Sequence, residues 1–183
     1  PESTATVTTT ATATPSPRPT PEPTDTETCA PFGTGDASAS SPDWAADLRA
    51  DLWGATMRLG QHECYDRWVF EFDGADAAPG WQVTPHGTNT FLGDPSGEPI
   101  DPLSGTASLE IMFAAWFDGT PIDEAPYEGP DVLYSKAGAI LEARIVGGFE
   151  GITQVGLGLD RERPYRVTWL EDPGRLVVDV YTG

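Results

Sequence analysis

Apolar and polar residues alternate along most of the chain after residue 54, which is the pattern of strands with one buried face. The clearest example has Trp68, Phe70 and Phe72 alternating with Arg67, Val69 and Glu71. Seven further short segments combine apolar positions with flanking turn residues. The eight predicted strands are Ala55–Leu59, Tyr65–Phe72, Trp81–Thr84, Ser108–Ala114, Ala139–Val146, Ile152–Leu159, Tyr165–Leu170 and Arg175–Val180.

This spacing predicts an all-β fold, namely an antiparallel sandwich or barrel of seven or eight strands with long loops. The segment Glu171–Gly174 has Pro-Gly in the order of a type II turn, so the last two strands should form a hairpin. Gly156 and Gly158 thin one face of their strand. No strand–helix–strand alternation and no internal repeat is apparent.

One helix is expected before the strands. Ser41 suits an N-cap and Pro42 a first helical position. Apolar residues follow at spacings of four, namely Trp44, Leu48 and Leu52. Gly54 would end the helix. We therefore expect three parts, which are a stalk (residues 1–28), an N-terminal extension with a possible short helix (residues 29–54) and a β domain (residues 55–183).

The stalk is Thr, Ser, Pro and Ala apart from Val7, Arg18 and four acids. It lacks the large apolar groups needed to offset the entropy of ordering, and its composition is typical of an extended, sometimes O-glycosylated stalk. We expect that a targeting segment has been removed and that the domain is extracytoplasmic, secreted or held at the cell surface. A lipid anchor, where present, would precede Pro1.

The formal net charge is −19, of which residues 29–183 carry −16. Such acidity excludes nucleic-acid partners, which require a basic footprint, and simple adsorption to anionic lipid. Solubility is the interpretation we favour. Weak Ca²⁺ binding or attraction to a basic partner remains the alternative. No apolar run is long enough to span a membrane, and we expect a monomer.

Two cysteines, Cys29 and Cys64, predict one disulfide in an exported chain. It would join the start of the domain to the first long strand. The alternative is a reactive Cys64 assisted by His62, because residues two apart in a strand share a face.

No motif indicates a reaction or a cofactor. His62 and His86 have no third ligand at a telling spacing, so we expect no metal site. Nucleophile elbow, phosphate loop and dinucleotide fingerprint are all missing from the sequence. A glycosidase needs two carboxylates across a cleft, but with 25 acids in the domain some pair would satisfy that by chance. We expect no enzyme, and an unrecognised hydrolase is the alternative.

Arginines and acids share the polar faces of two strands. Arg67 lies with Glu71 opposite the aromatic face, Arg175 shares a face with Asp179, and Glu150 sits in a predicted turn. One interpretation is cross-strand ion pairing, for instance of Arg67 with Asp179 or of Arg175 with Glu150. The other is a binding face whose guanidinium groups hold carboxylates or sugar hydroxyls.

Aromatic platforms suit sugar binding, and Trp116, beside an acidic Gly/Pro loop, is the tryptophan we most expect to be exposed. The candidate binding residues are Arg67, Glu150, Arg175, Asp179 and Trp116.

Several short motifs in order resemble the AMIN-like domain of actinobacterial secreted proteins and lipoproteins, over roughly residues 53–181. They are Gly60–Arg67 running into Val69-Phe70, Ser96-Gly97, Gly147–Gly151, Gly156–Gly158, Pro164–Val167 and Arg175–Val180. Residues 172–179 also look like the closing hairpin of the broader AMIN domain. AMIN domains are β-sandwich modules on cell-wall amidases and secretin pilots, where they bind peptidoglycan.

The resemblance implies a non-catalytic module of the cell envelope. Our leading hypothesis is a domain that binds cell-wall polymer, peptidoglycan or glycan, through a polar sheet face with Arg67, Glu150 and Arg175. The second hypothesis is a protein-interaction module that recruits a cell-wall enzyme or a secretion component, since no amidase or secretin domain accompanies these residues.

Overall fold

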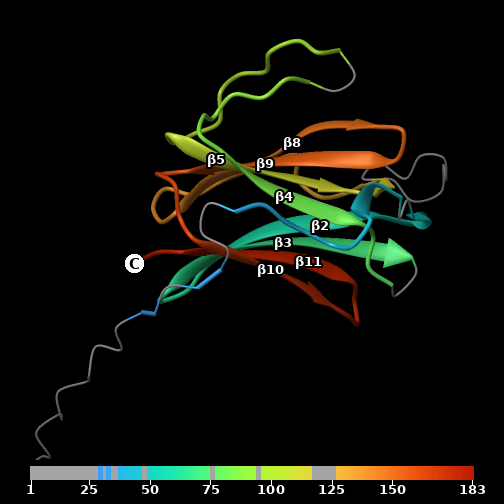
Figure 1. Ribbon diagram of the computed structural model, residues 1–183, viewed down its shortest axis with the longest axis horizontal. Coiled ribbons are helices and arrows are strands. Elements are labelled where there is room, and N and C mark those ends of the chain that lie inside the picture. The colour runs from blue at the N-terminus through green and yellow to red at the C-terminus, as the bar shows by residue number, and fades with distance from the viewer. Residues whose placement is uncertain are drawn as a thin grey trace, which may run out of the picture.

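The computed structural model describes residues 29–30, 32–33, 37–46, 49–74, 77–93, 96–116 and 127–183. Two β-sheets lie face to face (Figure 1). The predicted stalk lies outside the described residues. The strands are β1 (Ala39–Ser40), β2 (Arg49–Gln61), β3 (Tyr65–Gly74), β4 (Trp81–His86), β5 (Ala107–Phe113), β6 (Ala115–Trp116), β7 (Val132–Tyr134), β8 (Ile140–Phe149), β9 (Ile152–Leu159), β10 (Tyr165–Leu170) and β11 (Arg175–Tyr181).

Sheet A has the strand order β1-β4-β5-β9-β8-β7, and sheet B has the order β10-β11-β3-β2-β6. Neighbours are antiparallel except β2 and β6, which are parallel. The all-β prediction is confirmed, and the architecture is a sandwich rather than a closed barrel. All eight predicted strands are present, and the short strands β1, β6 and β7 are additional.

Alternation along β3 and β11 places large side chains between the sheets. Trp68 and Phe70 are fully buried and Phe72 nearly so. Both phenylalanines contact Phe113 of strand β5 in the facing sheet. The matching apolar face of β11 is equally buried and consists of Leu176, Val178 and Val180. Burial of such side chains, at roughly 1.5–3 kcal/mol each, is the main term that holds the sheets together.

The predicted helix is wrong. Only Trp44–Ala46 form a single 3₁₀ turn, and Arg49–Gln61 is strand β2. The strand pairs with β3 over most of its length and buries Leu52 in the core, so long-range pairing outweighs the local helical spacing. Gly54 marks a bulge in β2 rather than a helix end. Leu48 lies outside the described residues.

The N-terminal segment closes one side of the sandwich. Strand β1 pairs with β4 at the edge of sheet A, while Gly33 lies against the backbone of Tyr165 in sheet B. A Cβ on Gly33 would fall 1.5 Å from the Tyr165 carbonyl oxygen, and the φ of Gly33 is +93°. The Tyr165 hydroxyl donates to Ala37 and Val83. The described residues between Cys29 and Ser40 therefore contact both sheets.

The long β4–β5 connection folds back over the outer face of sheet A and projects as the green loop of Figure 1. Phe91 and Leu103 are buried in a small second core with Val146. They pack on Gly156 and Gly158 of β9, where a Cβ would crowd Leu103. The two glycines thus thin this face of the strand, as the sequence indicated.

The closing hairpin is confirmed, with Leu170 opposite Arg175. Its turn is not of type II, because the Asp172–Pro173 peptide bond is cis and the positive φ belongs to Asp172 at 55°.

Candidate functional site

The outer face of sheet B carries a row of three charged residues from three neighbouring strands. The β10–β11 register places Arg166 opposite Asp179, and the β11–β3 register places Asp179 opposite Arg67. Side chains that face one another across antiparallel strands stand about 5 Å apart, close enough for direct ion pairing. Strand pairing therefore places these three residues side by side.

Asp179 is shared by both arginines. Arg67 donates from Nε and Nη2 to the two carboxylate oxygens at 2.6 and 2.9 Å, which is a bidentate fork. Arg166 approaches Oδ2 through Nε and Nη2, both at 2.8 Å. The Asp179 side chain is 2% exposed, whereas those of Arg67 and Arg166 are 31% and 45% exposed. One buried acid thus holds two partly exposed cations.

The row also sets the ionisation of its members. Burial alone would raise the pKa of the Asp179 carboxyl, but the hydrogen bonds and charges of Arg67 and Arg166 outweigh burial, so this pKa lies below its ordinary value. The hydrogen bond to Asp179 raises the pKa of Arg67. With two arginines and one aspartate, the row has a formal net charge of +1.

Aromatic rings surround the two guanidinium groups. The Arg166 guanidinium lies 4.3 Å from the ring centre of Phe32, and that of Arg67 lies 5.1 Å from the ring centre of Tyr65. Phe32 makes edge contacts with both Tyr65 and Tyr181, at 5.9 and 5.8 Å. Such contacts favour cations and fix the plane of each guanidinium. We call Arg67, Arg166, Asp179, Phe32, Tyr65 and Tyr181 the arginine–aromatic cluster.

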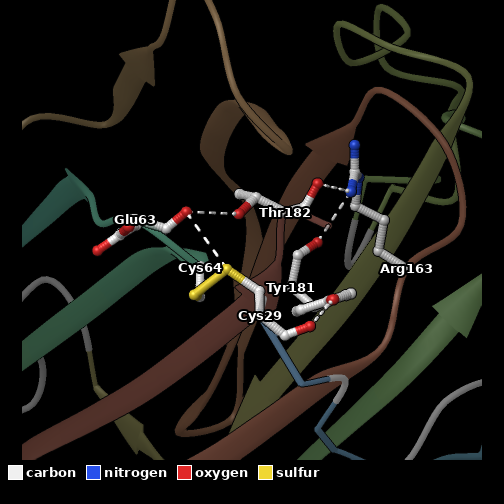
Figure 2. Close-up of a disulfide and its surroundings, with 6 residues drawn as sticks. All are labelled: Cys29, Glu63, Cys64, Arg163, Tyr181 and Thr182. Carbon is white, nitrogen blue, oxygen red and sulfur yellow. Dashed lines mark hydrogen bonds between the residues drawn. A yellow bond between two sulfur atoms is a disulfide. The ribbon is translucent and has the colours of Figure 1, made fainter. Parts of the chain in front are cut away.

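The predicted disulfide is confirmed, and it lies beside Tyr181 of this cluster (Figure 2). Cys29 and Cys64 are joined, so the alternative of a reactive Cys64 is wrong. The Tyr181 hydroxyl donates to the Cys29 carbonyl, and the Thr182 amide donates to the Cys64 carbonyl at 3.0 Å. The Cys29 sulfur lies 3.8 Å from the Glu63 carbonyl, a contact rather than a hydrogen bond because a disulfide sulfur carries no hydrogen.

These bonds hold the segment that carries Phe32 against the end of β11. The position of Phe32 over Arg166 therefore depends on a covalent link between two cysteines that lie 35 residues apart in the sequence. We call this end of the sandwich the disulfide end.

The other sequence-predicted residues lie elsewhere. Arg175 begins β11, four residues before Asp179, and its guanidinium donates to the carbonyls of Pro173 and Glu171 in its own turn. Glu150 is exposed in the β8–β9 turn of the other sheet, with a φ of 51°. Across the described residues, Arg175 and Glu150 form no ion pair with each other. Trp116 ends β6 beside Trp53, and its side chain is not among those described.

Sequence reasoning missed Arg166 and Phe32. Arg166 could have been found, because a four-residue turn that puts Leu170 opposite Arg175 necessarily puts Arg166 opposite Asp179. Phe32 gave no such signal, since it lies in an irregular segment whose position depends on the disulfide.

The described part of the chain contains no cluster of three or more His, Cys, Asp or Glu side chains that could hold a metal ion. Nor does it contain a helix long and apolar enough to cross a membrane.

Taken together, the fold and the cluster define a disulfide-linked β-sandwich module with a polar, arginine-bearing sheet face. The profile of the AMIN-like domain matches residues 54–182, and the chain belongs to this family. Membership fits a cell-wall-associated, non-catalytic module, and together with the disulfide it fits an extracytoplasmic location. Neither the curated proteins nor the solved structures searched gave a match to this chain.

Proposed function

We propose that this domain binds cell-wall polymer through the arginine–aromatic cluster, with Arg67 and Arg166 as the groups that contact the ligand. The observation that carries the proposal is the shared carboxylate of Asp179. It holds two guanidinium groups in place but uses only part of their donors. In the described contacts, Nη1 of Arg67 and Nη1 of Arg166 make no hydrogen bond.

The charge of the cluster supports an anionic ligand. A local charge of +1 stands out on a domain that carries −16, and planar guanidinium groups match carboxylates in geometry. Peptidoglycan offers carboxylates on its peptides and hydroxyls on its sugars. The rings of Tyr65 and Phe32 add apolar surface of the kind on which sugar rings stack. A polymer that carries both carboxylates and sugar rings therefore fits this face better than a ligand with only one of them.

The point at which the predicted stalk joins the domain also supports binding at the cluster. The stalk predicted for residues 1–28 joins the domain at Cys29, beside the cluster. We propose that a tether at this point, by a lipid anchor or otherwise, keeps the cluster within reach of the wall. Glu150 and Arg175 are not part of the site that we propose, since neither contacts the cluster in the described residues.

Sedimentation of the protein with purified peptidoglycan tests the proposal. The variant Arg166→Ala keeps the bidentate Arg67–Asp179 pair and so should fold, yet its retention should fall about five- to tenfold for one lost charged contact. Arg175→Ala is the matched control, because it removes an arginine from the same sheet face at the other end. No retention of the unaltered protein, or equal losses in both variants, would contradict the proposal.

A second candidate function is recruitment of an envelope protein, and the exposure of Leu92 favours it. Leu92 is 60% exposed on the projecting β4–β5 connection, which its own small core holds in position. If this loop carries the function, Leu92→Ser should release the protein from isolated cell envelopes whereas Arg166→Ala should not. The reverse result would favour the arginine–aromatic cluster.

A further inference from the structure

A cavity of about 190 Å³ opens at the end of sheet A, where β4 ends, β5 begins and the β9–β10 connection passes. It shares no lining residue with the arginine–aromatic cluster. Its apolar walls are Pro85, Leu109 and Leu159, and the two leucines are buried in the domain core. An enclosed cavity of about 150 Å³ lined only by apolar side chains can hold benzene, whereas this cavity is open and Ser108, Glu162 and Arg163 also line it. The space therefore has room for a short aliphatic chain that carries a polar end.

The one cation that lines the cavity is already committed. Arg163 forms a bidentate pair with Asp160, with Nε and Nη2 at 2.6 and 2.8 Å from the carboxylate oxygens. Its Nη1 donates to the carbonyls of Tyr181 and Thr182, as Figure 2 shows. The hydrogen bond to Asp160 raises the pKa of Arg163. The charge of Arg163 is thus balanced by Asp160, and its guanidinium has few donors left for an anionic ligand.

The acid that lines the cavity is free. Glu162 is exposed, and the described residues provide it with no hydrogen bond or ion pair. Its carboxylate is near the cavity mouth, because a Cβ placed on Gly87 would lie 3.9 Å from Glu162 Oε1. The neighbouring cation Arg161 is not part of the lining.

A second acceptor lies deeper. Ser108 is 1% exposed and donates its hydroxyl hydrogen to the Thr88 carbonyl at 2.6 Å. Because that hydrogen is already used, the Ser108 oxygen can only accept from a ligand that reaches it. The free polar groups of the cavity are both acceptors and stand beside an apolar wall.

We infer that this cavity binds a primary ammonium group on a short aliphatic chain, as at the end of a lysine or other diamino-acid side chain. The ammonium carries three donors and no acceptor, which complements Glu162 and Ser108. The alkyl chain packs on Pro85 and on the small part of Leu109 and Leu159 that lines the cavity. The site stands independently of the proposed function, because a wall polymer that binds at the cluster need not enter it.

Titration of the full chain with n-butylamine, which is an ammonium ion at pH 7, tests this site by amide chemical shifts. The expected result is saturable shifts confined to Gly87, Ser108, Leu159 and Glu162. Glu162→Gln should weaken binding about fivefold, as for a partly exposed ion pair. Gly87→Leu should abolish binding by filling the mouth, and it should fold because the position has open space and no positive φ.

1-Butanol and butyrate are the matched probes for shape without the cation, and Glu171→Gln is the control for loss of an exposed acid elsewhere. The inference is overturned if either probe binds as tightly as butylammonium or if butylammonium gives no saturable shifts. It is also overturned if Glu162→Gln binds no more weakly than Glu171→Gln.

Discussion

The two ends of the outer face of sheet B start from the same pattern and reach different structures. Strands β3 and β11 place an arginine directly opposite an acid at both ends, with Arg67 facing Asp179 and Arg175 facing Glu71. At the disulfide end the pair forms a bidentate ion pair with a buried acid. At the other end the facing residues do not bind each other.

The neighbours of each pair explain the difference. Glu71 accepts from Arg58 of β2 at 2.7 Å, with side chains 23% and 51% exposed, and Arg175 binds the carbonyls of its own turn. Asp179 instead lies between two arginines on flanking strands. Facing positions in the register are therefore not sufficient for an ion pair, and the adjoining strands and turns decide which pair forms.

Removal of the disulfide should have the largest effect on the disulfide end. We expect Cys29→Ser/Cys64→Ser to lower the free energy of unfolding by about 3–4 kcal/mol, because a loop of 35 residues is no longer closed in the unfolded chain. Urea denaturation measures this. A loss below about 1 kcal/mol would mean that the hydrogen bonds of Tyr181 and Thr182 hold the segment without the covalent link.

Asp179→Asn should come next, at about 2–3 kcal/mol, because two adjacent guanidinium groups lose their shared anion. This is less than for a fully buried pair, since both arginines are partly exposed. Glu71→Gln is the matched change at the other end, and it should cost less than about 1 kcal/mol in the same urea experiment. Equal losses would remove the distinction between the two ends.

Acid should weaken the disulfide end through Asp179. The pKa of this carboxyl is lower in the folded protein than the value of about 3.9 in an unfolded chain. Its contribution is therefore fully present above about pH 5 and is lost as pH falls through the folded pKa. The unfolding free energy should fall less steeply from pH 5 to pH 3 in Asp179→Asn than in the unaltered protein. Asp160, whose pKa Arg163 also lowers, should retain part of the slope.

Arg58→Ala should have the smallest effect, within about 0.5 kcal/mol, because its ion pair with Glu71 is exposed. The difference from the unaltered protein should shrink further in 0.5 M salt, which screens surface charges. Thermal melting at two salt concentrations would detect it. A loss of about 2 kcal/mol or more would contradict this prediction, because it would mean that the exposed ion pair contributes as much to stability as a buried one.

Much of the fold could be predicted from alternation. The strand with Trp68, Phe70 and Phe72 on one face buries that face in any antiparallel arrangement. The turn residues before Arg175 indicated the last hairpin. The helix over residues 42–53 was wrong because Trp44 and Leu52, eight apart, fit both a helical stripe and the inward positions of a strand. Only the pairing of β2 with β3 decides between them.

The site was predictable in part. Arg67 and Asp179 could be chosen because they share polar strand faces with other charges. The choice of Arg175 over Arg166 failed to anticipate the geometry, since turn carbonyls compete for a guanidinium at a strand end. The covering of Arg166 by Phe32 depends on contacts more than 100 residues apart, and no local pattern carries such information.

We propose that the disulfide end of sheet B, and not the other end, meets the cell-wall polymer. The most direct measurement follows the Nε–H signals of the arginine side chains by ¹H–¹⁵N NMR while soluble peptidoglycan fragments are added. We expect saturable shifts of the Arg67 and Arg166 signals with that of Arg175 unchanged. Shifts of Arg175 alone, or no shifts of any arginine at saturating fragment concentrations, would contradict it.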